Sequence, residues 1–169
     1  RTLLRVGAYP QVATARDSTG TLRPDSSLVY TSGRLVAFFD TLNSTNFAAL
    51  TPVALSVGAT QAEWDPTTVS WAFAVDTIND QRAWAEAGAG PITAFSTATW
   101  DPAMGDSAVF LLDSAQVAAW SDTTDVTRGV RIDMVDTGER LRVRDAALRL
   151  DARPGIDPDT ILDLSTDVR

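Results

Sequence analysis

The amino-acid sequence predicts an all-β fold, either a sandwich or a barrel. Apolar and polar residues alternate with a period of two through most of the chain, which is typical of strands with one face on a core and the other in water. Turn formers such as Ser32-Gly33, Asp65-Pro66 and Asp101-Pro102 separate these runs. Many short strands joined by turns indicate sheets that pack together.

The predicted strands follow one another between the turn formers. In one of them Val130, Ile132 and Met134 share a face, with Arg131 and Asp133 on the other. The residues 136–139 separate that strand from the next alternating run and predict a hairpin connection. The predicted strands are 34–40, 53–59, 68–73, 129–136, 141–144 and 147–151.

Helical patterns are short. Residues 114–120 predict two helical turns, with Ser114 as the N-cap and with Val117 and Trp120 on one face. Residues 80–87 predict a further turn that ends at Gly88. The polar loop 10–27 is the best candidate for a mobile or partner-contacting segment.

Composition excludes several chemistries. The chain has 169 residues, no His, no Cys and a net charge of −8, and all 14 of its cationic side chains are Arg. Triads built on His or Cys, zinc held by these residues, haem and disulfides are therefore excluded. The acidic balance argues against nucleic acid as a partner. The absence of Lys indicates GC-rich coding.

The first residue of the chain leads to an expectation about upstream sequence. The chain begins at Arg1 rather than Met, so we expect an upstream segment that has been removed or is not included. No apolar run reaches the roughly 20 residues that span a bilayer, and no signal peptide is visible.

Several segments together resemble one family. Residues 63–71 are similar to the W-x-E-x-x-V-T-W segment of the DNRLRE-type domains, and 84–90 to the Gly-rich stretch that follows it. The segments 109–113, 117–120 and 129–132 match its later strand, turn and strand in order. Residues 1–6 resemble its R-x-L-L-R-F-D strand, although Val6 and Gly7 replace Phe-Asp.

This resemblance implies a jelly-roll-like sandwich of two antiparallel sheets over residues 1–154, lacking the family's opening strand. A sandwich without that strand would leave a sheet edge that something else must cover. Residues 155–169 would form a C-terminal acidic arm, unless Ile161, Leu162 and Leu164 dock it on the sandwich. The family is extracytoplasmic, which implies the periplasm or surface of a GC-rich bacterium, and related modules bind carbohydrate and often hold a structural calcium.

Carboxylates are the numerous acid-base groups. Most lie next to turns, where they cap the backbone, and nothing in their spacing defines the facing pair that a glycosidase needs. The segment 122–125 offers two Asp for calcium but lacks the spacing of an EF-hand loop. The candidates are Glu63, Asp65, Asp76, Glu86, Asp101, Asp106, Asp113, Asp122, Asp125, Asp133 and Asp136.

The five Trp residues are either core or a platform on which sugar rings stack. Trp71 alternates with Val69 and Phe73, so we expect it in the core. Trp64 and Trp120 match family positions that are structural. The possible ligand platform consists of Trp84 and Trp100.

Arginines indicate either ion pairs or a partner surface. Arg140, Arg142, Arg144 and Arg149 lie on alternating positions, and we expect ion pairs across the strands with Asp133 and Asp136. The alternative is an anionic partner surface. The possible partner contacts are Leu3, Arg5, Arg23, Arg140, Arg142 and Arg144.

These observations predict a non-catalytic structural or interaction module, an accessory subunit or domain of a larger extracytoplasmic assembly. The sequence predicts no enzyme activity and no cofactor, protein partners in an assembly that could be membrane-associated, and no nucleic acid. A carbohydrate-binding module with a glycan ligand is the alternative. A glycosidase based on carboxylates is a remote third hypothesis.

Overall fold

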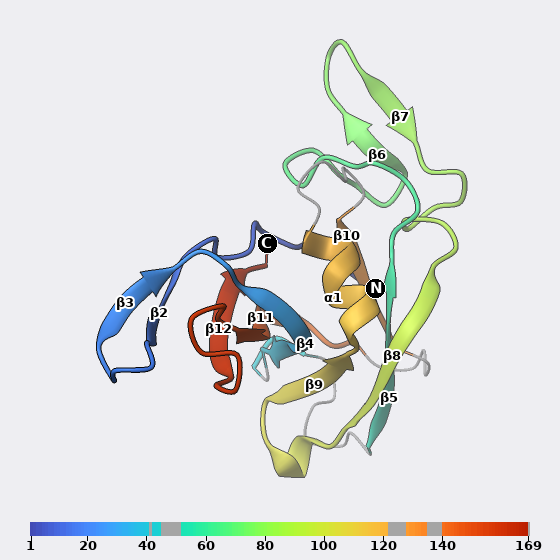
Figure 1. The fold of residues 1–169 in the computed structure, drawn as a ribbon. Coiled ribbons are helices and arrows are strands. Elements are labelled where there is room, and N and C mark those ends of the chain that lie inside the picture. The colour runs from blue at the N-terminus through green and yellow to red at the C-terminus, as the bar shows by residue number, and fades with distance from the viewer. Residues whose placement is uncertain (41, 45–51, 122–127, 135–139, 169) are drawn as a thin grey trace.

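Two antiparallel sheets of four strands each pack face to face (Figure 1), which confirms the predicted all-β sandwich. The computed structural model describes residues 1–40, 42–44, 52–121, 128–134 and 140–168. The first sheet has the order β1 (Thr2–Arg5), β10 (Gly129–Met134), β5 (Val53–Ala59), β8 (Thr93–Trp100). The second sheet has the order β12 (Leu162–Asp167), β11 (Val143–Arg153), β4 (Val29–Phe39), β9 (Ser107–Leu112).

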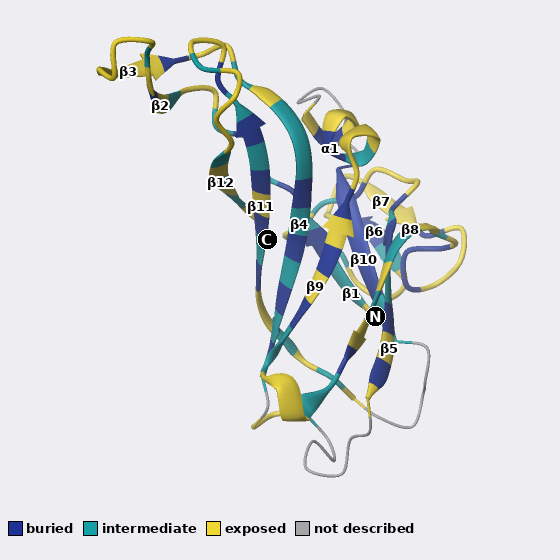
Figure 2. Ribbon diagram, turned by 60° about the horizontal axis from the view of Figure 1, so that its bottom comes forward, coloured by how far each residue is buried: buried dark blue, intermediate teal, exposed yellow. Residues whose placement is uncertain are grey.

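The core lies between the two sheets, and buried residues alternate with less buried ones along strands such as β4 and β9 (Figure 2). Leu35, Phe110 and Leu148 of the second sheet and Val57 and Val130 of the first are completely buried. The period-two alternation produces this core because successive side chains of a strand point to opposite faces. Each strand therefore also presents an outer set of side chains, which the core does not use.

The C-terminal segment belongs to the sandwich rather than forming a free acidic arm. Strand β12 pairs antiparallel with β11, and its Leu164 packs against the core. Beyond the ends of β12 and β1, Val6 and Val168 form a bridge, and the Gly7 amide donates to the Asp167 carbonyl at 2.8 Å. A Cβ at Gly7 would lie 2.8 Å from that same carbonyl oxygen, so the close approach requires glycine.

One predicted helix is confirmed and the other is wrong. Helix α1 (Ser114–Ser121) buries Val117 and Trp120. Its cap is Asp113 rather than Ser114, because the Asp113 carboxylate accepts a hydrogen bond from the Gln116 amide at 2.8 Å. The 80–87 segment instead contains strand β7 (Gln81–Ala83), paired with β6 (Phe73–Asp76).

Two strand predictions also need correction. The strand expected over 68–73 is a series of turns, and β6 begins only at Phe73. The connection 136–139 lies outside the described residues, but it is no hairpin, because β10 and β11 belong to different sheets. The runs 141–144 and 147–151 contribute to one long strand, β11, with a register shift near Val143.

The segment 10–27 forms a small hairpin that projects from the sandwich (Figure 1). Its strands are β2 (Ala13–Arg16) and β3 (Leu22–Asp25). The buried Asp25 carboxylate accepts hydrogen bonds from the Ser27 and Ile156 amides at 2.8 and 3.0 Å, and so ties the hairpin to the loop after β11. A short 3-10 turn, η2 (Pro102–Met104), joins β8 to β9.

Candidate functional site

Part of the outer face of the first sheet, over β1 and β10, is covered by the chain itself. The segment 60–92, which includes β6 and β7, builds a second cluster of buried side chains from Trp64, Ala74, Trp84 and Ala89. Leu3 of β1 packs against this cluster. Leu3 on the outer side of β1 therefore belongs to a second core, and residues 60–92 are here called the covering segment.

Arg131 attaches the covering segment to the sheet. This arginine lies on the outer side of β10 with only 5% of its side chain exposed, and it pairs with Asp133 at 2.6 Å. It also donates hydrogen bonds to the carbonyls of Gly88, at 2.9 Å, and of Gly90. Gly88 has a φ of +78° and lies against the Trp71 ring, 2.7 Å from where a Cβ would be. Only glycine fits both requirements without strain.

The outer face of the second sheet has a different character. Leu111 of β9 lies opposite Arg34 of β4, and Val109 lies opposite Val36. Leu111 is 74% exposed and Val109 46%, although both are large and apolar. Phe38 and Val36 lie on the same side of the sheet and are half-buried. We call Val36, Phe38, Val109 and Leu111 the outer apolar patch.

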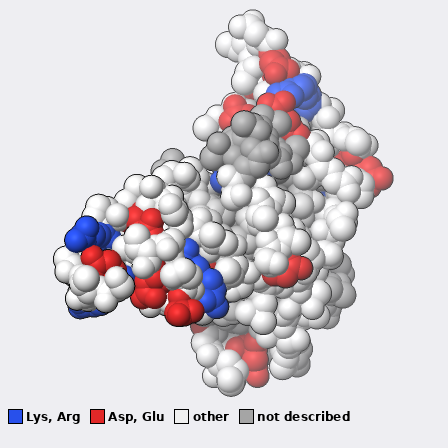
Figure 3. Space-filling model, in the orientation of Figure 1, with Lys and Arg blue, Asp and Glu red and all other residues white. Residues whose placement is uncertain are grey.

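This patch reaches the free edge of the second sheet. Strand β9 is the edge strand, and its six residues carry no charge. The opposite edge strand, β12, carries Asp163 and Asp167. Figure 3 shows that the basic side chains on the face in view gather over the β2–β3 hairpin and the β6–β7 region, whereas acidic groups also occur elsewhere on it. Charges on an edge strand discourage pairing with another chain, so β9 is the less protected edge.

The proposed sugar platform of Trp84 and Trp100 does not form. Trp84 is 7% exposed and Trp100 is 2% exposed. Their indole N–H groups donate to the carbonyls of Ser70 and Gly105, each at 3.0 Å, and Trp100 also packs against the ring of Phe39. Trp100 is the last residue of β8 and belongs to the main core, and Trp84 belongs to the second cluster, which their loop-like sequence context does not reveal.

The prediction for Trp71 is also wrong, but here a residue that was expected to be buried is exposed. It was expected in the core and is 63% exposed, because its segment forms turns instead of an alternating strand. The guanidinium of Arg1 lies 5.4 Å from the centre of its ring. Trp64 and Trp120 are buried, as expected.

The expected ion pairs between the arginines of 140–149 and Asp133 do not form. Asp133 lies on β10 in the other sheet and pairs with Arg131 and Arg1. Asp136 lies outside the described residues. Arg144 instead pairs with Asp106 at 3.3 Å, and both side chains are about half exposed. Such an exposed pair contributes little to stability.

The remaining partner-contact residues are dispersed. Arg23 pairs with Asp17 at the tip of the β2–β3 hairpin, at 2.8 Å. Arg140 and Arg142 are exposed at the start of the β11 region. Leu3 is covered by the chain's own second cluster, and Arg5 lies near the end of β1 with its Nη1 3.5 Å from the Trp64 carbonyl. The six residues therefore do not form one surface.

The carboxylates whose pKa values are perturbed cap turns. Hydrogen bonds from Thr67 hold the pKa of Asp65 below its usual range, and hydrogen bonds from the Ile156 and Ser27 amides do the same for Asp25. Asn43 lowers the pKa of Asp40, and Thr19 that of Asp17. A general acid needs a raised pKa, whereas the pKa values of these four carboxyl groups are lowered. The calcium candidate at 122–125 lies outside the described residues, and the described residues hold no group of three acidic side chains suited to a metal.

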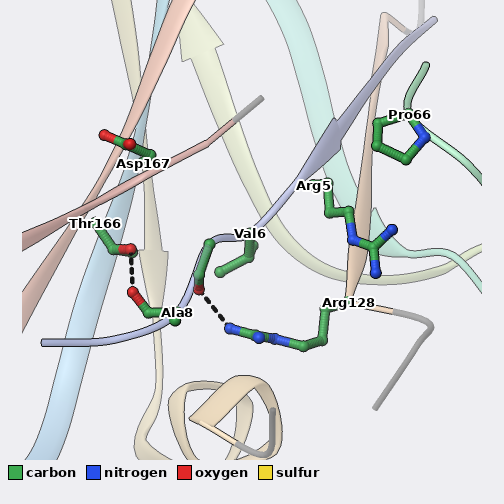
Figure 4. A pocket seen from close by; sticks show the side chains of 8 residues that line it. Arg5, Val6, Ala8, Pro66, Arg128, Thr166 and Asp167 are labelled. Atoms are coloured by element: carbon green, nitrogen blue, oxygen red, sulfur yellow. Dashed lines mark hydrogen bonds between the residues drawn. The ribbon is translucent and has the colours of Figure 1, made fainter. Parts of the chain in front are cut away.

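A cavity of about 500 Å³ lies where β1 and β12 end (Figure 4). Its walls include Arg5, Arg128, Pro66, Thr166 and Asp167. Arg5 was a predicted contact residue, whereas Arg128 was missed, because a single Arg before a strand carries no recognisable pattern. Only the fold brings residues 5–8 and 166–167 together with Arg128.

Comparisons with known proteins do not identify a relative: no family model, no curated protein and no solved structure matches this chain. The resemblance to DNRLRE-type domains therefore stays a prediction. In the part of the chain that the structure describes, no helix has the length and apolarity needed to cross a membrane.

Proposed function

We propose that this protein is a non-catalytic interaction module that binds a protein partner through the outer apolar patch and the adjacent edge strand β9. The carrying observation is the contrast between the exposed Leu111 and Val109 and the covered part of the outer face of the first sheet. Contiguous exposed apolar residues on a protein surface mark interaction sites. An uncharged edge strand next to them is suited to pairing with a strand of the partner.

The assignment to a larger extracytoplasmic assembly is part of the same proposal. It is supported by the sequence resemblance and by the lack of His and Cys, which removes the commonest catalytic groups. The charges at the two ends of β9 favour a partner other than a second copy. Asp106 and Asp113 flank the strand, so antiparallel pairing of two β9 strands would bring like charges together.

Site-specific crosslinking in the native cells tests this function. A photoreactive amino acid at Leu111 is expected to give one discrete adduct with another protein. The matched control is Ile78, which is fully exposed at the far end of the β6–β7 hairpin and should give none. Val109→Asp should abolish the Leu111 adduct. Equal adducts at both positions, or none at Leu111, would contradict the proposal.

A carbohydrate-binding module is the second candidate, and the exposed Trp71 is the observation that favours it. A single ring next to Arg1 can stack on a sugar. The burial of Trp84 and Trp100 removes the larger platform. Binding on a glycan array that is lost in Trp71→Ala and kept in Leu111→Ser would favour this candidate over the first. Among the described carboxyl groups, every perturbed pKa is lowered, which is not the raised pKa that the general acid of a glycosidase needs.

A further inference from the structure

The cavity at the joined ends of β1 and β12 has the dimensions of a small-molecule site. Its volume of about 500 Å³ falls within the range of ligand pockets. The bridge between Val6 and Val168 and the hydrogen bond from Gly7 to Asp167 form its floor from main chain. Such a floor is held in place by the sheet pairing on both sides.

Arg128 is the unusual residue of this cavity. It is only 7% exposed, and its Nε has no hydrogen-bond partner. Its Nη2 donates to the Gly7 carbonyl (Figure 4), and among the described residues no carboxylate forms an ion pair with it. Burying a guanidinium without a compensating anion is unfavourable, because the charge loses its hydration. An anion in the cavity would offset that cost.

The nearby Arg131 is a buried arginine with a structural role, and its partners can be compared with those of Arg128. Arg131 is 4% exposed, and it has Asp133 as a counterion and two carbonyls as acceptors. Arg128 precedes it by three residues and is buried to a similar degree. Among the described residues, Arg128 has one acceptor, the Gly7 carbonyl, and no counterion, whereas Arg131 has both a counterion and two carbonyl acceptors.

Arg5 adds a second cation to the same cavity. Its one hydrogen bond in the described structure is the long contact of Nη1 with the Trp64 carbonyl, at 3.5 Å. In Figure 4 the guanidinium of Arg128 reaches toward the Gly7 carbonyl, that of Arg5 lies toward Pro66, and Asp167 lies on the far side. Thr166 is engaged there through its hydroxyl, which donates to the Ala8 carbonyl at 2.6 Å. The lining of the cavity therefore contains two cations and one carboxylate.

We infer that this cavity binds the carboxylate group of a small ligand between Arg5 and Arg128. Planar guanidinium groups match a carboxylate through paired, charge-assisted hydrogen bonds. The ligand class is a small carboxylic acid, either a sugar acid or a short organic acid. This inference goes beyond the proposed function and is independent of it, because the cavity lies at the β1–β12 side of the sandwich and the outer apolar patch reaches the β9 edge.

NMR titration of the full chain at constant ionic strength tests the inference. The probes are sodium glucuronate, sodium acetate, glucose and sodium sulfate. We expect saturable shifts at the amides of Gly7, Ala8 and Gly129 with glucuronate or acetate, and none with glucose. Binding of glucuronate about tenfold tighter than acetate, equivalent to about 1.4 kcal/mol, would indicate a sugar acid. Comparable affinities would indicate a short organic acid.

Three results would overturn it. Sulfate that binds as tightly as the carboxylates would show a non-specific anion site, and the absence of saturable shifts with both carboxylates would show no site. Unchanged binding in Arg5→Gln, where we expect at least a tenfold loss, would remove the assigned residues. Arg34→Gln is the matched control, since Arg34 is an exposed arginine of the second sheet paired with Asp163, and it should leave binding unchanged.

A second variant tests Arg128 through stability rather than binding. A buried charge without a counterion carries a desolvation cost that an apolar side chain does not have. Arg128→Met should therefore unfold at the same or a higher temperature than the wild type without ligand, and should lose the rise in unfolding temperature that carboxylate causes in the wild type. A marked drop in unfolding temperature without ligand would show that Arg128 is structural and would overturn the assignment.

Discussion

The two outer faces of this sandwich differ although both derive from the same alternating pattern. On the first sheet, Leu3 and Arg131 lie under the segment 60–92, which forms its own small core around Trp64 and Trp84. On the second sheet, Val109 and Leu111 remain exposed. An apolar residue at an outer strand position can therefore be buried by another segment of the same chain, or it can stay exposed and bind a partner protein.

The difference shows where function can reside. The covered part of the first face is stabilised internally, so a substitution there changes folding. The second face contributes little to folding, because its side chains are already in water, and its apolar content needs another explanation. Four predictions, ordered by expected effect, test this distinction.

The largest effect is expected from Trp84→Ala in the covering segment. Removal of this buried ring leaves a cavity and should destabilise the protein by about 3–5 kcal/mol. Urea unfolding followed by circular dichroism measures the change. Leu111→Ala is the matched control on the other face and should alter stability by at most about 0.5 kcal/mol. Similar losses in both variants would mean that the two faces do not differ in the way we describe.

Arg131→Met should come next, with a loss of about 3 kcal/mol. The substitution removes a buried ion pair with Asp133 and leaves the carbonyls of Gly88 and Gly90 without their donor. Arg34→Met, which breaks the exposed pair with Asp163, should cost less than about 1 kcal/mol. Equal effects of the two variants, measured by urea unfolding, would show that Arg131 does not fasten the covering segment.

Acid should weaken the covering segment by a smaller amount. The folded pKa of Asp65 is held below its usual value by Thr67, so the carboxylate stabilises the fold above the unfolded pKa of about 3.9. That contribution is lost as the pH falls below this value and through the folded pKa. Thermal unfolding from pH 5 to pH 2.5 should show a smaller fall in Asp65→Asn than in wild type. An identical fall in both would contradict the role of Asp65.

The smallest effect on stability is expected from Leu111→Ser, within about 0.5 kcal/mol of wild type. The side chain is 74% exposed, so its removal leaves no cavity. The same variant should lose the crosslinked partner when the photoreactive group is moved to Val109. A large destabilisation would show that Leu111 is needed for folding, which would contradict a role in partner binding alone.

Local patterns predicted much of the sandwich and little of its surface. Period-two alternation identified β4, β5, β10 and β11, and the helical spacing of Val117 and Trp120 identified α1. The same rule failed at Trp71, where turns interrupt the alternation. It also suggested a hairpin between β10 and β11, since a short gap in sequence does not reveal that the chain crosses to the other sheet.

The candidate sites depended on contacts between distant residues. Trp84 and Trp100 looked like loop residues, but Trp100 ends strand β8 and lies in the main core, and Trp84 lies in the second cluster. The cationic cavity joins Arg5 to Arg128, more than a hundred positions away, and to Thr166 beyond that. In the sequence, Arg5 was a candidate contact residue. Nothing in the sequence associated it with Arg128.

By itself, the sequence predicted an all-β fold, a sandwich or a barrel, without His or Cys chemistry, because strand alternation and composition are local properties. The tertiary structure alone decided that the strands form a sandwich, which part of the outer surface is covered, which Trp residues are buried and which residues line the cavity at the ends of β1 and β12. These properties depend on strand order and on the packing of one segment over another, and neither is encoded in the spacing of neighbouring residues.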